Sequence, residues 1–284
     1  MNPIISLEIN NFKIGATASS LINTPIIGLT IPNVRTSSGD YSGRSGGWVD
    51  GQFYSKREIV IRGVLRGCGQ TVMDELNDLQ NSLPINQLLP LFIRTKYGNY
   101  LAEVYFTNLN IKFNSFKWLE YELTLVAPEP YLYSTGDGID PDSGWINFVI
   151  QKAIGGGYIT PYVLPVVWEA GTQPNIINNV GAEVLPQIIL NGKWTNPVIT
   201  NLTTNKFIKL NLTSAVGDKI IIDMRERTIT LNDGSILPYR DSNSDWWAIA
   251  NGLNVIEVTS SSQTDTSEAI IRYREQYLGI GANI

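Results

Sequence analysis

The chain has 284 residues, and 43% of them are hydrophobic, which is enough to build the cores of about two domains. Charged residues make up only 17%, and the formal net charge is -5. The chain therefore lacks the basic surface that binding to phosphate backbones requires. We expect no nucleic acid partner.

The sequence contains no histidine and a single cysteine, Cys68. The absence of histidine excludes Ser-His-Asp and Cys-His catalysis, and it excludes zinc sites with ordinary ligand spacing. The carboxylates Glu120 and Glu122 are close in sequence, but on one strand they would not face each other across a cleft. We expect no catalytic activity, no cofactor and no metal. A glycan hydrolase that uses only carboxylates stays open as a further hypothesis.

The first residues, MNPIISLEINNFKIG, do not show a positive region followed by an apolar stretch. No later segment approaches the ~18 uninterrupted apolar residues of a transmembrane helix. We expect a soluble protein that does not insert into a membrane.

The segment from Ser37 to Phe53 is dense in glycine and serine and contains Trp48. It lacks the Lys-Ser or Lys-Thr pair with which a phosphate-binding loop ends. This composition predicts a flexible loop or a hairpin arm.

Alternating apolar residues predict antiparallel strands over 57–65, 108–113 and 117–127. The last of these strands places four side chains on one face: Leu119, Tyr121, Leu123 and Leu125. Between the first two strands, TVMDELNDLQNSLP predicts one helix with Thr71 as its N-cap, which ends before Pro84. Its apolar stripe consists of Val72, Met73, Leu76, Leu79 and Leu83. These elements predict an α+β domain in which the helix packs against an antiparallel sheet.

Two prolines flank Glu129 in APEPYLYS, immediately after the last of these strands. Proline cannot donate a hydrogen bond to a sheet, so this segment predicts a domain boundary. We expect an N-terminal domain over 1–130 and a C-terminal domain over 131–284, with an irregular extension at about 137–173.

Past Asn178, short apolar runs are separated by turn residues at roughly 10-residue intervals. The runs are PQIILNG, KFIKLNLT, DKIIIDM, RTITLNDGS, WWAIANG, NVIEVTS and AIIRYREQYL. They predict an all-β sandwich or jelly roll. The fold class expected for the whole chain is therefore mainly β.

Two adjacent tryptophans, Trp246 and Trp247, fall within one of these runs. On a strand they would point to opposite faces, with one in the core and the other beneath a loop, a neighbouring domain or a neighbouring subunit. Both tryptophans are candidates for an aromatic contact at the protein surface. The alternative function is a carbohydrate-binding module in which Trp194, Trp246 or Trp247 stacks on a host surface glycan.

Three stretches resemble the distal tail protein (Dit) family of long-tailed, non-contractile phages. They are GGWVDGQFYSKREIVIRGVLRG (46–67), APEPYLYS (127–134) and VGDKIIIDMRERTITLNDGS through SDWWAIANGLNVIEV (216–258). The resemblance implies a structural protein, not an enzyme, whose N-terminal half forms a hexameric ring at the tail tip. It also implies a galectin-like C-terminal sandwich that faces outward. Sugar-binding galectins use a histidine beside a tryptophan, which this chain cannot supply.

The same resemblance implies other copies of the chain, the tail tube protein, the tail hub protein and receptor-binding proteins as partners. It places the protein in the virion, at the phage tail tip, after assembly in the host cytoplasm. For the ring contacts we select Trp48, Tyr54 and Trp118, aromatic residues near loops or on outward strand faces.

Overall fold

The computed structural model describes residues 4–15, 20–22, 25–67, 70–115, 117–136, 142–150, 175–263 and 267–280. The chain forms two compact units, which we call unit 1 (Met1–Gly144 with Gln276–Ile284) and unit 2 (Trp145–Glu275). This division falls after Gly144 instead of at the 130/131 boundary expected from the prolines. Cys68 and most of the expected extension at 137–173 lie outside the described residues.

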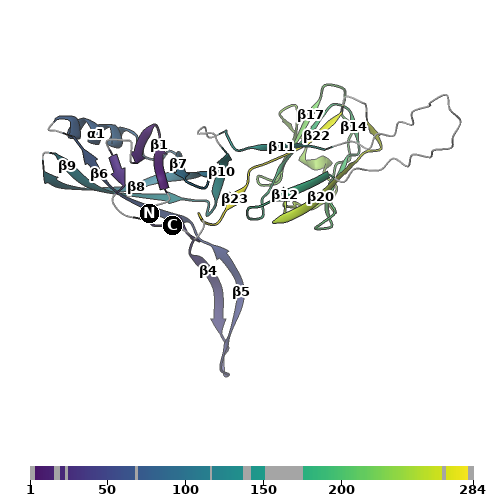
Figure 1. Cartoon of the computed structure of the whole chain (residues 1–284). Helices are drawn as coiled ribbons and strands as arrows, with labels where there is room; N and C mark the ends of the chain where they lie inside the picture. The colour runs from purple at the N-terminus through teal and green to yellow at the C-terminus, as the bar shows by residue number, and fades with distance from the viewer. Residues whose placement is uncertain are drawn as a thin grey trace. The chain divides into compact units, whose positions relative to one another are not determined.

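Unit 1 is built on a nine-stranded antiparallel sheet (Figure 1). Its strand order is β2-β1-β7-β8-β9-β6-β3, and β10 pairs with both β8 and β23. The strands are β1 (Ile4–Ile9), β2 (Phe12–Gly15), β3 (Ser20–Ile22), β6 (Arg57–Arg66), β7 (Leu89–Thr95), β8 (Asn99–Ser115), β9 (Trp118–Ala127), β10 (Leu132–Gly136) and β23 (Gln276–Tyr277). The three strands expected from alternation correspond to β6, β8 and β9.

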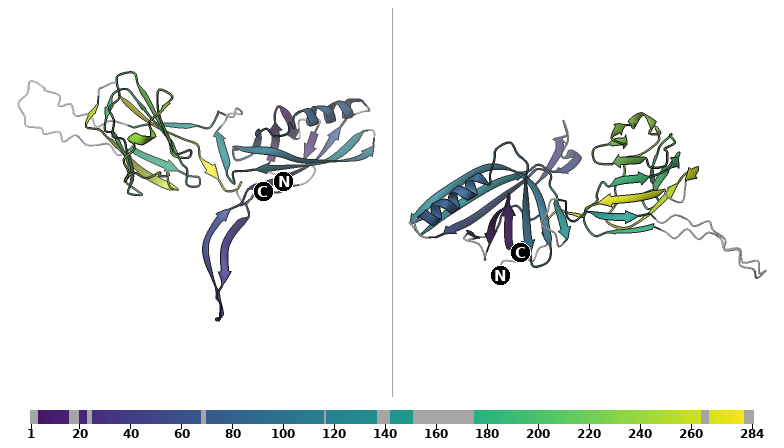
Figure 2. Two further views of the ribbon diagram at one scale, coloured as in Figure 1. Left: turned by 180° about the vertical axis from the view of Figure 1, so that it is seen from behind. Right: turned by 90° about the horizontal axis from the view of Figure 1, so that it is seen from above.

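Helix α1 (Gln70–Asn81) lies across one face of this sheet (Figure 2). It buries Val72, Leu76 and Leu79 against the sheet, as the apolar stripe predicts. Met73 is exposed, so its place in the stripe was wrongly predicted. Thr71 lies inside the first turn because the helix already begins at Gln70, and it is not the N-cap.

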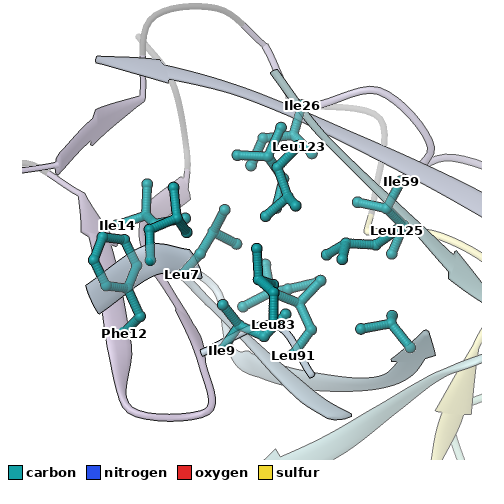
Figure 3. Close-up of a cluster of buried hydrophobic side chains, with 14 of the residues drawn as sticks. Leu7, Ile9, Phe12, Ile14, Ile26, Ile59, Leu83, Leu91, Leu123 and Leu125 are labelled. Carbon is teal, nitrogen blue, oxygen red and sulfur yellow. The ribbon is translucent and has the colours of Figure 1, made fainter. Parts of the chain in front are cut away.

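The core of unit 1 lies between α1 and the sheet, where aliphatic side chains from several strands converge (Figure 3). The inward face of β9 carries Leu119, Tyr121, Leu123 and Leu125, all buried as expected. Tyr121 brings its hydroxyl into this core, where it is paired with the Ser20 hydroxyl at 2.7 Å. Burial raises the pKa of Tyr121 to about 12, while the hydrogen bond to Ser20 acts in the opposite direction.

Unit 2 is a sandwich of a six-stranded and a four-stranded antiparallel sheet. The first has the order β11-β22-β13-β17-β18-β19: β11 (Ile146–Val149), β22 (Glu268–Tyr273), β13 (Gln187–Asn191), β17 (Lys219–Asp223), β18 (Thr228–Leu231) and β19 (Gly234–Ser235). The second has the order β12-β20-β15-β16: β12 (Asn175–Asn179), β20 (Gly252–Thr259), β15 (Val198–Asn201) and β16 (Lys206–Lys209). A two-stranded ribbon, β14 (Trp194–Thr195) with β21 (Ser262–Gln263), and a 3-10 turn (Leu237–Tyr239) complete the unit.

Alternation on facing strands explains this sandwich. Ile188, Leu190 and Ile220 from the six-stranded sheet share one buried cluster with Ile199 and Ile256 from the four-stranded sheet. The mainly β fold is confirmed, and α1 is the one α-helix among the described residues.

Candidate functional site

Strands β4 (Val34–Asp40) and β5 (Gly47–Tyr54) form a hairpin that pairs with no other described strand. We call this hairpin the arm; Figure 1 shows it as a separate two-stranded ribbon. None of its residues is buried, so it contributes nothing to the core of unit 1. An isolated two-stranded hairpin is at best marginally stable in water. The arm therefore needs stabilisation from within or from a partner.

Part of this stabilisation comes from aromatic rings that lie over glycines. Trp48 stands opposite Gly39 on the neighbouring strand, and a Cβ atom added to Gly39 would lie 2.9 Å from its ring. A Cβ atom added to Gly51 would lie 3.0 Å from the ring of Phe53. The guanidinium of Arg35 lies 5.6 Å from the centre of the Phe53 ring. These rings cover the ribbon but keep their outer faces open to solvent.

The three residues selected for ring contacts are all exposed, but they do not form one site. Trp48 and Tyr54 are on the arm and are 45% and 39% exposed, opposite Gly39 and Val34 respectively. Since Val34 and Gly39 are five residues apart on one strand, the two aromatic side chains project from opposite faces of the ribbon. Trp118, 40% exposed, begins β9 in the nine-stranded sheet.

The tryptophans considered for sugar stacking are mostly buried. Trp247 is 0% exposed, so its prediction as a surface contact was wrong. Trp194 is also buried, and its indole N–H donates to the Asn191 carbonyl at 3.0 Å. Only Trp246 is half-buried, with the Arg240 guanidinium 5.2 Å from its ring.

The tryptophan segment is not the expected strand, because residues 244–248 have no strand structure. Buried side-chain amides hold it instead. Asn254 donates to the Ala250 carbonyl at 2.8 Å and accepts from the Ala250 N–H at 3.0 Å. Asn201 donates to the Ala248 carbonyl and to the Asn254 side chain, and Asn179 donates to the Ile249 carbonyl.

We had not predicted any of these three asparagines, which are all fully buried. The available signal was the Gly-x-Asn pattern after the aromatic pair, in which Gly252 begins β20 and Asn254 points into the core. The amides replace the sheet hydrogen bonds that a strand would have made at this position.

Part of the outer face of the four-stranded sheet carries exposed aliphatic side chains. Ile176 on β12 lies directly opposite Val255 on β20, and the Leu202 N–H donates to the Val255 carbonyl at 2.8 Å. Leu253, two residues along β20 on the same face, is among the most exposed apolar residues of unit 2. The most exposed apolar side chains on this surface are Ile176, Leu202 and Leu253. Phe207 on β16, opposite Thr200, also faces outward and is half-buried.

Charged residues gather on the outer face of the sheet in unit 1, around a shallow groove of about 430 Å³. Glu120 and Glu122 lie two positions apart on β9, and Glu122 pairs with Arg62 at 2.5 Å. Within the described ranges, no group of three or more histidine, cysteine, aspartate or glutamate side chains lies close enough together to hold a metal ion. None of the helices in the same ranges has the length and apolarity needed to cross a membrane.

Comparisons with known proteins identify the class of this fold. Residues 180–277, about a third of the chain, match the family model of the siphovirus-type tail component, C-terminal domain. A search of curated proteins gives no match.

Among solved structures, the chain is similar to the Dit protein of phage SPP1, described as a paradigm of the hub adsorption apparatus in phages that infect Gram-positive bacteria. The TM-score is 0.70 at 13% identity, over 96% of this chain and 98% of that chain. Structures of the phage p2 baseplate in its activated conformation, with calcium or strontium, also match. They have TM-scores of 0.45 at 11% and 12% identity, over 97% of this chain and 99% of theirs. The resemblance to the distal tail protein family is confirmed, in sequence over 180–277 and in fold along the chain.

Proposed function

We propose that this protein is a structural component of a phage tail tip, which closes into a hexameric ring and joins the tail tube to the tail hub. The tail-component match over 180–277 and the Dit-like fold support this class of function. The observation that carries ring formation is the exposed arm. We assign ring closure to unit 1, and contact with receptor-binding proteins to unit 2.

The arm has the properties expected of a contact with a second copy. It exposes Trp48, Val49, Phe53 and Tyr54 together with unpaired strand edges. Burying one large apolar side chain contributes about 1.5–3 kcal/mol, so several such side chains on one hairpin supply a substantial interface. Because every copy has the same arm, contact with a different surface of the next copy generates either a ring or an open filament.

The low charge and the absence of histidine from the sequence fit a protein that acts through assembly. The expected partners are the tail tube protein on one face of the ring and the hub protein on the other. The protein would be assembled in the host cytoplasm and remain in the virion.

The test is to replace residues 36–52 with a short Gly-Ser turn and to determine the mass of the assembly by native mass spectrometry. The full chain is expected to form a six-subunit species or stacked rings, and the armless variant a folded monomer. Leu253→Ser on the outer face of unit 2 is the control, and should assemble like the full chain. A full chain that stays monomeric at micromolar concentration, or an armless variant that still forms six-subunit rings, would contradict the proposal.

The carbohydrate-binding alternative retains only Trp246 of its three tryptophans, because Trp194 and Trp247 are buried. Sugar rings stack on exposed aromatic faces, whereas the most exposed apolar side chains on the outer sheet face of unit 2 are Ile176, Leu202 and Leu253, and the outward-facing Phe207 is half-buried. Glycan-array binding that is lost in a folded Trp246→Ala variant would restore this alternative.

A further inference from the structure

Arg57 is a buried arginine at the base of the arm, three residues after β5 ends, and it is 2% exposed. Its Nη1 atom donates to the carbonyls of Gly28 at 2.5 Å and Thr30 at 2.6 Å. Its Nε and Nη2 atoms donate to the Pro130 carbonyl at 3.0 and 2.6 Å, and Nη2 also donates to the Leu278 carbonyl at 2.7 Å. One guanidinium thus binds four backbone carbonyls.

The four carbonyls belong to segments with distinct roles in the chain path. Gly28 and Thr30 precede the arm, which begins at Val34. Pro130 precedes β10, along which the chain continues towards unit 2, and Leu278 follows β23, along which it returns to unit 1. Both sides of the arm base and both connecting segments therefore meet at Arg57.

Direct contacts reinforce this meeting point. The Ile280 N–H donates to the Leu29 carbonyl at 2.9 Å, and a Cβ atom added to Gly279 would lie 3.0 Å from the carbonyl carbon of Thr30. At the arm base, the Ser55 N–H donates to the Asn33 carbonyl at 2.7 Å. The returning segment thus packs directly beside the strand connection that leads into the arm.

Arginine suits position 57 better than lysine because of the geometry of its donors. A planar guanidinium has five N–H donors in a fixed arrangement, whereas a lysine ammonium has three on a single atom. Among the described residues, Arg57 pairs with no carboxylate, so hydrogen bonds to carbonyl dipoles alone offset its desolvation. Burial lowers the pKa of Arg57 to about 10, which leaves it charged at neutral pH.

We propose that Arg57 is a positioning residue that couples the base of the arm to the two chain segments connecting unit 1 with unit 2. A displacement of the returning segment pulls on the Leu278 carbonyl, and the guanidinium transmits this to Gly28 and Thr30 at the arm base. The inference concerns contacts within unit 1 and does not depend on ring formation.

The experiment is a double-mutant cycle read by amide hydrogen exchange at Ser55, measured at one oligomeric state. The cycle starts from a chain that ends at Gly279, which has lost the Ile280 N–H bond to Leu29 but keeps the Leu278 carbonyl. It compares this chain with a truncation after Tyr277 that removes the Leu278 carbonyl, with Arg57→Lys, and with the two changes combined. Losing a hydrogen bond to a charged group should speed Ser55 exchange roughly tenfold in each single variant. In the Arg57→Lys background the truncation should add less than about twofold, because the link is already broken.

Two controls define the coupling. Arg62→Lys changes an arginine on the same strand whose side chain is 48% exposed, and should leave Ser55 exchange unchanged. The Tyr41 N–H, bonded to the Gly46 carbonyl near the turn of the arm, should be unaffected in every variant. If truncation leaves Ser55 unchanged, or speeds it by the same factor in the Arg57→Lys background as in the chain that keeps Arg57, the proposal is overturned. If Arg57→Lys does not fold, the comparison between the chains that end at Gly279 and at Tyr277 decides, by its effect on Ser55 relative to Tyr41.

Discussion

Replacing Asn254 with alanine tests whether buried amides hold the tryptophan segment. The Asn254 side chain donates to the carbonyls of Ala250 and Gly252 at 2.8 and 3.0 Å. It accepts from the Ala250 N–H at 3.0 Å and from the Asn201 amide at 3.2 Å. Each hydrogen bond contributes about 1 kcal/mol net, and a buried group left without a partner costs about 1–3 kcal/mol. We expect the free energy of unfolding of unit 2 to fall by about 4 kcal/mol.

Urea unfolding followed by tryptophan fluorescence measures this loss, because Trp247 lies in the core that the segment closes. The matched control is Asn178→Ala, which removes an exposed asparagine from β12 and should change stability by less than about 0.5 kcal/mol. If Asn254→Ala unfolds within about 0.5 kcal/mol of the unchanged chain, the amides do not support the segment as argued.

Three further changes probe the two cores. The pKa of Tyr121 rises from 10.0 to about 12 on folding, so the neutral phenol stabilises the folded state by about 3 kcal/mol. This stability is fully present below pH 10 and is lost as the pH rises through 12. Tyr121→Phe should flatten this alkaline loss in unfolding titrations, whereas Tyr97→Phe, at an exposed position, should not. Gly63→Ala should lower stability by roughly 1–3 kcal/mol in thermal unfolding, since its Cβ atom would lie 2.4 Å from the Tyr121 hydroxyl; an unchanged midpoint would count against this packing. Trp247→Ala should cost about 3–5 kcal/mol and half-buried Trp246→Ala clearly less, and equal losses in denaturant unfolding would contradict the assigned burial.

The strands and the helix could be predicted because their signal is local. Along β9 the burial of Leu119, Tyr121, Leu123 and Leu125 repeats every second residue, so periodicity alone places the core face. The arm has no such periodicity, since none of its residues is buried, and the sequence therefore left a loop and a hairpin equally open.

The Gly-x-Asn pattern marks Asn254, but no local signal identifies the hydrogen-bond partners of the buried asparagines or of Arg57. Asn201 and Asn254 are 53 positions apart, and Arg57 and the Leu278 carbonyl are 221 apart. Hydrogen bonds of this kind depend on the folded chain path, which a single sequence does not reveal. The apolar neighbours of Trp247 predicted a strand. These neighbours are indeed buried, but side-chain amides from outside the segment hold its backbone in place.

The most direct test of the central claim is cryo-electron microscopy of the purified full chain. The account predicts closed rings of six copies, with the arm of each copy packed on its neighbour and Trp48 covered. Particles of single-copy size at micromolar concentration, or rings in which every arm remains free in solvent, would contradict it.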